Sequence, residues 1–215
     1  MTILQIVGRS SSLFTRLPLI FAEELGVEYE LVPIYDMSER GSEVYAGNPA
    51  LKLPILRSGG STLFGALNIC RALAERASTS PAQIVWPEQL RDDLSRNAQE
   101  LVWHCMATQV QLVMGTIVGK LPVDNIYFEK ARTGLLGSLN WLEANLQDAL
   151  RALPSERSLS VFEVSLFCLI EHLIFRPTVS VSSYTMLERF ARDFSKRSSA
   201  QRTVYQFDVA PGRSA

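Results

Sequence analysis

Residues 48–73, NPALKLPILRSGGSTLFGALNICRAL, contain the pattern that decides the fold. After the Asn-Pro pair, the short apolar run LPIL (53–56) predicts a strand, and Ser58-Gly59-Gly60 favours a tight turn. STLF (61–64) then supplies a partner strand. The next residues, ALNICRALAERA (66–77), have apolar side chains at helical spacing. This stretch therefore predicts an antiparallel hairpin followed by a helix.

The residues before this stretch predict two parallel strands joined by a helix. TILQIV (2–7) is apolar and rich in β-branched side chains, and EYELVPI (28–34) alternates as a strand does. Between them, LFTRLPLIFAEELG (13–26) has helical spacing and ends on a glycine, a common helix stop. A helical crossover of this kind places the two strands parallel. Residues 35–47 predict a loop with a short helix. We therefore expect a small α/β domain with a four-stranded mixed sheet.

The second half of the chain predicts helices alone. Residues 78–87, STSPAQIVWP, contain two prolines and predict a linker. Beyond it, Asp124 is the expected N-cap of one helix, and Ser160 with Glu163 has the form of a capping box at the start of another. The expected helices cover residues 88–119, 124–153, 160–175 and 183–196. The predicted organisation is a domain at 1–77, a linker at 78–87, an all-helical domain at 88–200 and a loosely held tail at 201–215.

Composition excludes several classes of function. The formal net charge is −1, without the concentrated basic patch that nucleic-acid binding needs. No apolar run reaches the length of a membrane span, and the N-terminus lacks the features of a signal peptide, so we expect a cytoplasmic location. Neither histidine has a metal-ligand partner at helical spacing, and no metal site is expected. The cysteines form no CxxC motif, and we expect all three to be buried and inert: Cys70, Cys105 and Cys168.

The deciding stretch resembles the glutathione transferase superfamily. Its members carry an Asn-Pro pair, an apolar-Pro pair, a strand, a hairpin and a polar pair opening the next helix, in that order. Three later stretches also resemble the family: NWLEANL (140–146), SLSVFEVSLF (158–167) and RSSAQRTVYQFD (197–208). The resemblance covers nearly the whole chain. It implies a thioredoxin-like α/β N-terminal domain plus an all-α C-terminal helical bundle, the fold of glutathione transferases.

The resemblance implies a glutathione-binding site in the N-terminal domain. Pro54 would follow a cis peptide bond, which X–Pro bonds adopt at low cost, and would aim the backbone of Leu53 at a peptide-like ligand. Alternatively, Pro54 merely begins a strand. Lys52 stands where it could pair with the glycyl carboxylate, or it is a solvated surface lysine. Gly65 and Ala66 occupy the positions of the family's acidic-Ser pair, and neither has a polar side chain, although the helix N–H groups remain.

The resemblance also places a catalytic hydroxyl between the first strand and the first helix. Ser12 is the leading candidate there, with Ser11 and Ser10 as alternatives. A hydroxyl donor beside a helix N-terminus lowers the pKa of a thiol toward neutrality. A serine before a helix also serves as an N-cap, and the sequence leaves the two interpretations open.

The implied function is transfer of the glutathione thiolate to a small apolar electrophile. Four residues could line the electrophile pocket: Phe14, Trp103, His104 and Met106. For Trp103 and Met106, core packing is an alternative. A different class of function is a non-catalytic binding or scaffold protein of the same fold, with glutathione binding weakened by the Gly65-Ala66 change. Glutathione-dependent thiol reduction ranks last because the loop before the first helix contains no cysteine. The resemblance also implies a homodimer, with glutathione as co-substrate, no metal, no nucleic acid and no membrane.

Overall fold

The computed structural model describes every residue except 1–2, 78–82, 211 and 213–215. The chain divides into two compact units. One unit contains residues 1–81 together with 197–215, and the other contains residues 82–196. The first unit is therefore built from two separate parts of the sequence. Residues 78–82, half of the predicted linker, lie outside the described residues.

The first unit contains the predicted four-stranded mixed sheet. Its strands are β1 (Leu4–Gly8), β2 (Tyr29–Pro33), β3 (Ile55–Ser58) and β4 (Ser61–Phe64), in the spatial order β2-β1-β3-β4. Strand β2 is parallel to β1, whereas β3 is antiparallel to both β1 and β4. The parallel pair and the Gly-Gly hairpin are thus both confirmed.

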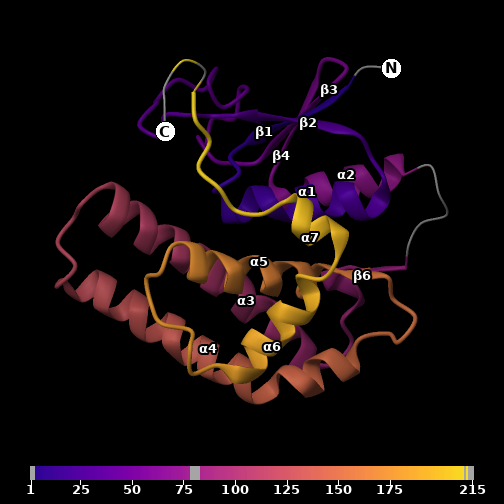
Figure 1. Cartoon of the computed structure of the whole chain (residues 1–215), viewed down its shortest axis with the longest axis vertical. Helices are drawn as coiled ribbons and strands as arrows, with labels where there is room; N and C mark the ends of the chain where they lie inside the picture. The colour runs from indigo at the N-terminus through magenta and orange to yellow at the C-terminus, as the bar shows by residue number, and fades with distance from the viewer. Residues whose placement is uncertain (1–2, 78–82, 211, 213–215) are drawn as a thin grey trace. The chain divides into compact units, whose positions relative to one another are not determined.

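Two helices lie side by side on one face of this sheet, α1 (Leu13–Leu25) and α2 (Ala66–Arg76) (Figure 1). Helix α1 ends where Gly26 adopts a left-handed conformation with φ +62°, as the glycine stop predicts. The opposite face buries an apolar cluster of four residues, Val7, Ile34, Tyr45 and Ile55. Partly buried side chains of the segment before β3 pack against this cluster.

The short helix expected within residues 35–47 does not form. Residues 42–47 make a succession of turns, in which Tyr45 N donates to Ser42 O and Ala46 N donates to Glu43 O. The turns end at Ala46 and Gly47, whose φ angles are +50° and +82°. A right-handed helix cannot propagate through two residues with positive φ, so the segment remains a loop.

The segment from residue 197 belongs to the first unit, whereas the sequence predicted residues 197–200 in the helical domain and residues 201–215 as a loosely held tail. Helix α7 (Ser198–Arg202) lies beside α1 (Figure 1). The Arg16 side chain of α1 is only 2% exposed, and its Nη2 donates to Ala200 O at 3.1 Å. Its guanidinium lies over the ring of Tyr205, 4.4 Å from the centroid. A buried charge needs such partners, and the tail supplies them.

The second unit contains the four predicted main helices: α3 (Asp93–Leu112), α4 (Ile126–Ala152), α5 (Val161–Phe175) and α6 (Thr185–Phe194). Helix α3 begins later than predicted, because residues 87–89 form a separate 3-10 helix, η1. Asp92 caps α3, and its Oδ1 accepts from Ser95 N at 2.8 Å. It continues into the π-helical segment η2 (Val113–Val118). Asn125 caps α4 instead of the predicted Asp124. The predicted Ser160 cap of α5 is confirmed, with Glu163 N donating to Ser160 Oγ at 3.1 Å.

One short strand pair departs from the prediction, since one strand lies within the predicted linker 78–87 and the other lies in the region predicted to be helical. Strand β5 (Ile84–Val85) pairs in parallel with β6 (Leu159–Ser160). Both strands are buried and only two residues long. The pairing holds the entry of the helical unit beside the start of α5.

One helix passes a length and composition test for a membrane span. The continuous helical segment Asp93–Val118 is long and apolar enough by those two criteria. Four of its large apolar side chains are buried in the core of the helical unit: Val102, Met106, Leu112 and Val113. Core helices of soluble proteins meet the same criteria, so the segment carries no membrane assignment.

Candidate functional site

Three predicted site segments converge at one edge of the sheet. In the register, Val7 lies opposite Ile55, and Ile55 lies opposite Phe64. Ser10, Ser11 and Ser12, which we call the serine loop, follow the end of β1. The cis-Pro54 precedes β3, and Gly65 follows β4. Because β3 is antiparallel to both neighbours, the end of β1, the start of β3 and the end of β4 meet at the same edge. The edge therefore brings the serine loop, Pro54 and the α2 N-terminus together.

Ser12 caps helix α1. Its amide N–H donates to Arg9 O at 3.0 Å, closing a turn, and its Oγ accepts from Thr15 N at 3.3 Å. The capping interpretation is thus confirmed for this serine. A hydroxyl that accepts at a cap still has its own proton, so Ser12 can also donate to an anion at the positive end of α1. Capping and donation are compatible for this serine.

The other two serines have different surroundings. Ser11 is buried. The Ser10 amide N–H donates to Asp208 Oδ2 at 2.9 Å, and the Ser10 hydroxyl donates to Asp208 Oδ1 at 2.6 Å. Asp208 is a site residue that sequence reasoning missed. It lies 198 positions from Ser10, and no local pattern signals their contact.

The Leu53–Pro54 peptide bond is cis, as predicted. The buried Asn48 side chain organises the loop before it, because its Nδ2 donates to Lys52 O at 2.8 Å and its Oδ1 accepts from Ala50 N at 3.0 Å. Pro54 O accepts from Gly65 N at 3.3 Å, which ties this loop to the start of α2. Among the described residues, no backbone hydrogen bond outside the helices and strands involves Leu53. The Lys52 side chain is exposed, and both interpretations of it remain open.

Helix α2 begins without a side-chain cap. Gly65 is its N-cap residue and Ala66 its first helical residue. Gly65 has φ +90° and ψ 135°, a conformation that L residues rarely adopt, while the space around its Cα is open. The backbone conformation, not crowding, therefore favours glycine at this position. The start of α2 offers backbone N–H groups and no side-chain donor or acceptor of its own at positions 65 and 66.

Residues 11–76 match the family "Glutathione S-transferase, N-terminal domain". Glutathione S-transferase 4 from Zea mays is 32% identical over 114 residues, an alignment that spans 47% of this chain and about half (51%) of that relative. Residues 11–76 belong to this N-terminal domain family, and the chain is similar to glutathione S-transferases.

Solved structures of glutathione transferases share the fold of this chain over nearly its full length. A family member from Pseudomonas fluorescens Pf-5, solved with bound glutathione, has a TM-score of 0.76 at 19% identity and covers 94% of this chain and 99% of its own. A glutathione S-transferase from Methylobacillus flagellatus KT, also with glutathione bound, has a TM-score of 0.73 at 19% identity and covers 94% and 98%. At such identities the likeness establishes the fold, thioredoxin-like sheet and helical part together.

The residues predicted to line an electrophile pocket lie on two helices, one in each unit. Phe14 lies on α1, half-buried. The other three lie on α3 in the second unit, where Met106 is fully buried and Trp103 half-buried. His104 is exposed, with its Nε2 3.2 Å from Glu100 Oε1. Burial favours the core-packing interpretation for Met106, and the pocket itself remains a prediction.

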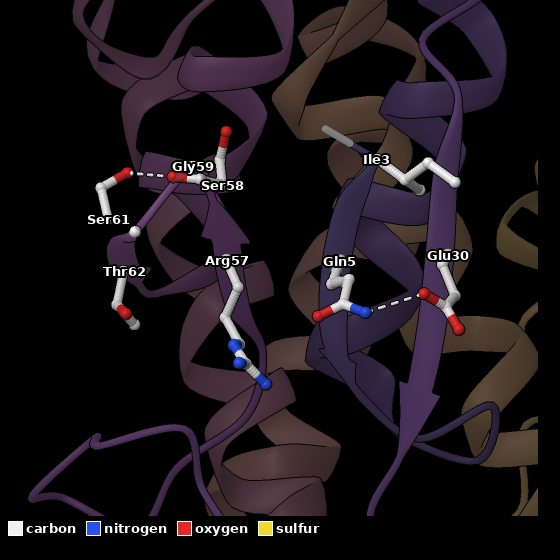
Figure 2. A pocket seen from close by; sticks show the side chains of 9 residues that line it. Ile3, Gln5, Glu30, Arg57, Ser58, Gly59, Ser61 and Thr62 are labelled. Carbon is white, nitrogen blue, oxygen red and sulfur yellow. Dashed lines mark hydrogen bonds between the residues drawn. The ribbon is translucent and has the colours of Figure 1, made fainter. Parts of the chain in front are cut away.

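A polar hollow lies at the opposite end of the same sheet (Figure 2). Within it, Gln5 Nε2 donates to Glu30 Oε2 at 2.8 Å across the paired strands. Because β1 starts and β3 ends here, this hollow is separated from the serine loop by the length of β1. Its lining residues are Ile3, Gln5, Glu30, Arg57, Ser58, Gly59, Gly60, Ser61 and Thr62. The hollow therefore takes no part in the candidate site.

The cysteines of this chain lie outside the site. All three are buried and free of disulfides. Burial raises the pKa of the Cys105 thiol to about 12, despite a hydrogen bond with Ser138 that lowers it. A protonated, inaccessible thiol is a poor nucleophile. Among the residues that the structure describes, no three His, Cys, Asp or Glu side chains gather as metal ligands would.

Proposed function

We propose that this chain binds glutathione at the sheet edge and transfers its thiolate to small apolar electrophiles. In this reaction the thiol proton leaves to solvent, and the sulfur forms a bond to the electrophilic carbon while that carbon gives up a leaving group or a π electron pair. The proposal is supported by family membership and by the convergence of the serine loop, cis-Pro54 and the α2 N-terminus.

The placement of the Ser12 hydroxyl at the N-terminus of α1 carries the proposal. A free thiol has a pKa of about 8.5, so little thiolate exists at neutral pH. The partial positive charge of the helix N-terminus and one hydroxyl donor both stabilise the thiolate. Ser12 combines the two, because its oxygen accepts from Thr15 N and its proton remains for donation.

A second candidate function is ligand binding or scaffolding without turnover. The observation that favours it is the start of α2, where Gly65 supplies no side-chain cap. A missing charge-assisted hydrogen bond weakens binding by about 1.5–3 kcal/mol, roughly tenfold to a hundredfold. A chain with that loss would hold glutathione weakly or accept another ligand.

Calorimetry with glutathione and a conjugation assay with an aromatic halide separate the two functions. For the transferase, Ser12→Ala should lower turnover at neutral pH by about 10²-fold, if one donor to the developing anion contributes about 2.7–4 kcal/mol. It should change glutathione affinity little and cost about 1 kcal/mol of stability through the lost cap. Ser160→Ala is the matched control, since it removes the N-cap hydroxyl of α5 in the other unit and should leave turnover per folded molecule unchanged.

Ala66→Ser tests the binding edge directly. A hydroxyl at the first residue of α2 should tighten glutathione binding if the γ-glutamyl carboxylate lies at this N-terminus. The companion change Gly65→Glu is unsuitable because φ +90° strains any side chain there. Measurable glutathione binding without turnover would favour the scaffold function. No binding by the wild type or Ala66→Ser would overturn the transferase function and leave a protein of this fold with another ligand.

The proposal includes a homodimer in the cytoplasm. Closed two-fold dimers are the commonest assembly of soluble homo-oligomers. Light scattering should therefore give about twice the mass of the 24.0 kDa chain.

A further inference from the structure

The segment Thr203–Asp208 runs from α7 to the serine loop within the first unit. Its start is held firmly, because Thr203 and Tyr205 are buried and both contact the buried Arg16 guanidinium. Its far end is held differently. Beyond Tyr205, the Phe207 side chain is 57% exposed, so its apolar burial contributes little to holding the segment against α1.

The far end is attached to the serine loop through Asp208. One carboxylate takes both polar hydrogens that Ser10 can offer, the amide N–H at 2.9 Å and the hydroxyl at 2.6 Å. Ser10 precedes Ser12 by two residues, so the two Cα atoms lie at most about 7 Å apart. A thiolate held by Ser12 would therefore share one short loop with a carboxylate of the same charge.

We propose that residues 203–208 form a C-terminal strap whose Asp208 carboxylate competes with the glutathione thiolate at the serine loop, so that glutathione binding requires Asp208 to leave Ser10. The inference rests on the proposed function. It adds a regulation of the site: the closed strap disfavours the thiolate, and the open strap frees the Ser10 amide and hydroxyl for the ligand.

Electrostatics supports competition over cooperation. Two like unit charges disfavour each other by more than tenfold when they lie about 10 Å apart at an effective dielectric constant of 20. Removing the carboxylate should therefore help thiolate formation. A strap closed about ten to one would lower the apparent glutathione affinity by about tenfold.

Two variants separate the effect of the negative charge of Asp208 from the effect of its side chain being present beside Ser10. Asp208→Asn retains the shape and an acceptor oxygen, whereas Asp208→Ala removes the side chain. Asp148→Asn is the matched control, because Asp148 is an exposed residue of α4 paired only locally with Arg151 at 2.9 Å. Glutathione affinity is measured by calorimetry across pH, and opening of the strap by hydrogen exchange at Ser10 and at residues 203–208.

We expect Asp208→Ala and Asp208→Asn to bind glutathione about tenfold more tightly, with the bound thiol ionising at lower pH, while Asp148→Asn matches the wild type. Saturating glutathione should raise hydrogen exchange at residues 203–208 in the wild type. Equal affinity in wild type and both Asp208 variants, or a strap that stays protected when glutathione is bound, overturns the inference and leaves the proposed function standing. Absence of binding by every variant overturns the proposed function and the inference with it. Binding by the Asp208 variants alone supports both.

Discussion

The ion pair between Glu24 of α1 and Arg197 allows a quantitative test of how the C-terminal segment joins the first unit. Arg197 Nε and Nη2 donate to the two Glu24 carboxylate oxygens at 2.8 and 2.7 Å, and the Ser199 hydroxyl donates to the same carboxylate. A hydrogen bond to a charged group contributes about 1.5–3 kcal/mol. Because the Arg197 side chain is 37% exposed, solvent screening reduces the expected contribution of the cluster to about 1–2 kcal/mol.

Glu24→Gln should therefore lower the free energy of unfolding at pH 7 by about 1–2 kcal/mol. Burial by itself raises the pKa of Glu24, but the bonds from Arg197 and Ser199 outweigh it and hold the pKa below the ordinary value of 4.5. A carboxyl with a lowered folded-state pKa contributes stability that is present above its unfolded pKa and is lost as the pH falls through the folded pKa. The gap between wild type and Glu24→Gln should thus be full above about pH 5 and shrink in more acidic solution.

Urea unfolding between pH 3 and pH 7 measures the gap, and hydrogen exchange over residues 197–205 assigns it to the C-terminal segment. Asp148→Asn again serves as the control, because its pair with Arg151 is exposed on both sides and should contribute almost nothing. A Glu24→Gln deficit no larger than that of Asp148→Asn would refute the reasoning. So would a deficit that stays constant as the pH falls.

Three other changes have defined outcomes. Glu143→Ala should destabilise the helical unit by about 1–2 kcal/mol and raise hydrogen exchange at the start of α6, because the Glu143 carboxylate accepts from Met186 N and Leu187 N at 2.8 and 3.0 Å; unchanged exchange there would contradict this role. Gly8→Ala should lower the free energy of unfolding, measured by thermal denaturation, by about 1–3 kcal/mol, because the new methyl group would lie 2.6 Å from Thr15 Oγ1. If this clash is the cause, adding Thr15→Ala to Gly8→Ala should recover part of the lost stability. Cys105 should resist a maleimide in the native protein at pH 8 and react only after unfolding, because burial raises its pKa to about 12; rapid labelling of the folded chain would show that the thiol is accessible.

Local patterns predicted the elements that depend on local chemistry. The strand at Ser61–Phe64 and the helix that starts at Ala66 match their predicted positions, because a Gly-Gly turn and a helical apolar repeat both act over a few residues. The Ser160 cap was predictable for the same reason. Adjacent Asp124 and Asn125 are both good N-caps, and only the backbone conformation selects Asn125.

Long-range contacts were beyond local pattern. Strands β5 and β6 are two residues each and pair across some 75 positions, so neither has a periodicity to detect. The turns before Asn48 end on positive φ at Ala46, which composition does not signal. At the candidate site, the serine loop and the proline were predictable from resemblance, whereas Asp208 was not, because its partner lies at the other end of the chain.

The discontinuous first unit has a consequence for how the chain is made. Arg16 is synthesised early, but its hydrogen-bond acceptor Ala200 follows 184 positions later. At a synthesis rate of about 5–20 residues per second, the α1 surface waits roughly 10 to 40 s for the segment that covers it. For that interval the nascent sheet and its two helices have a guanidinium facing water where the finished protein buries it. The helical unit emerges in the meantime, so it can fold on the ribosome before the sheet unit that precedes it in sequence is complete.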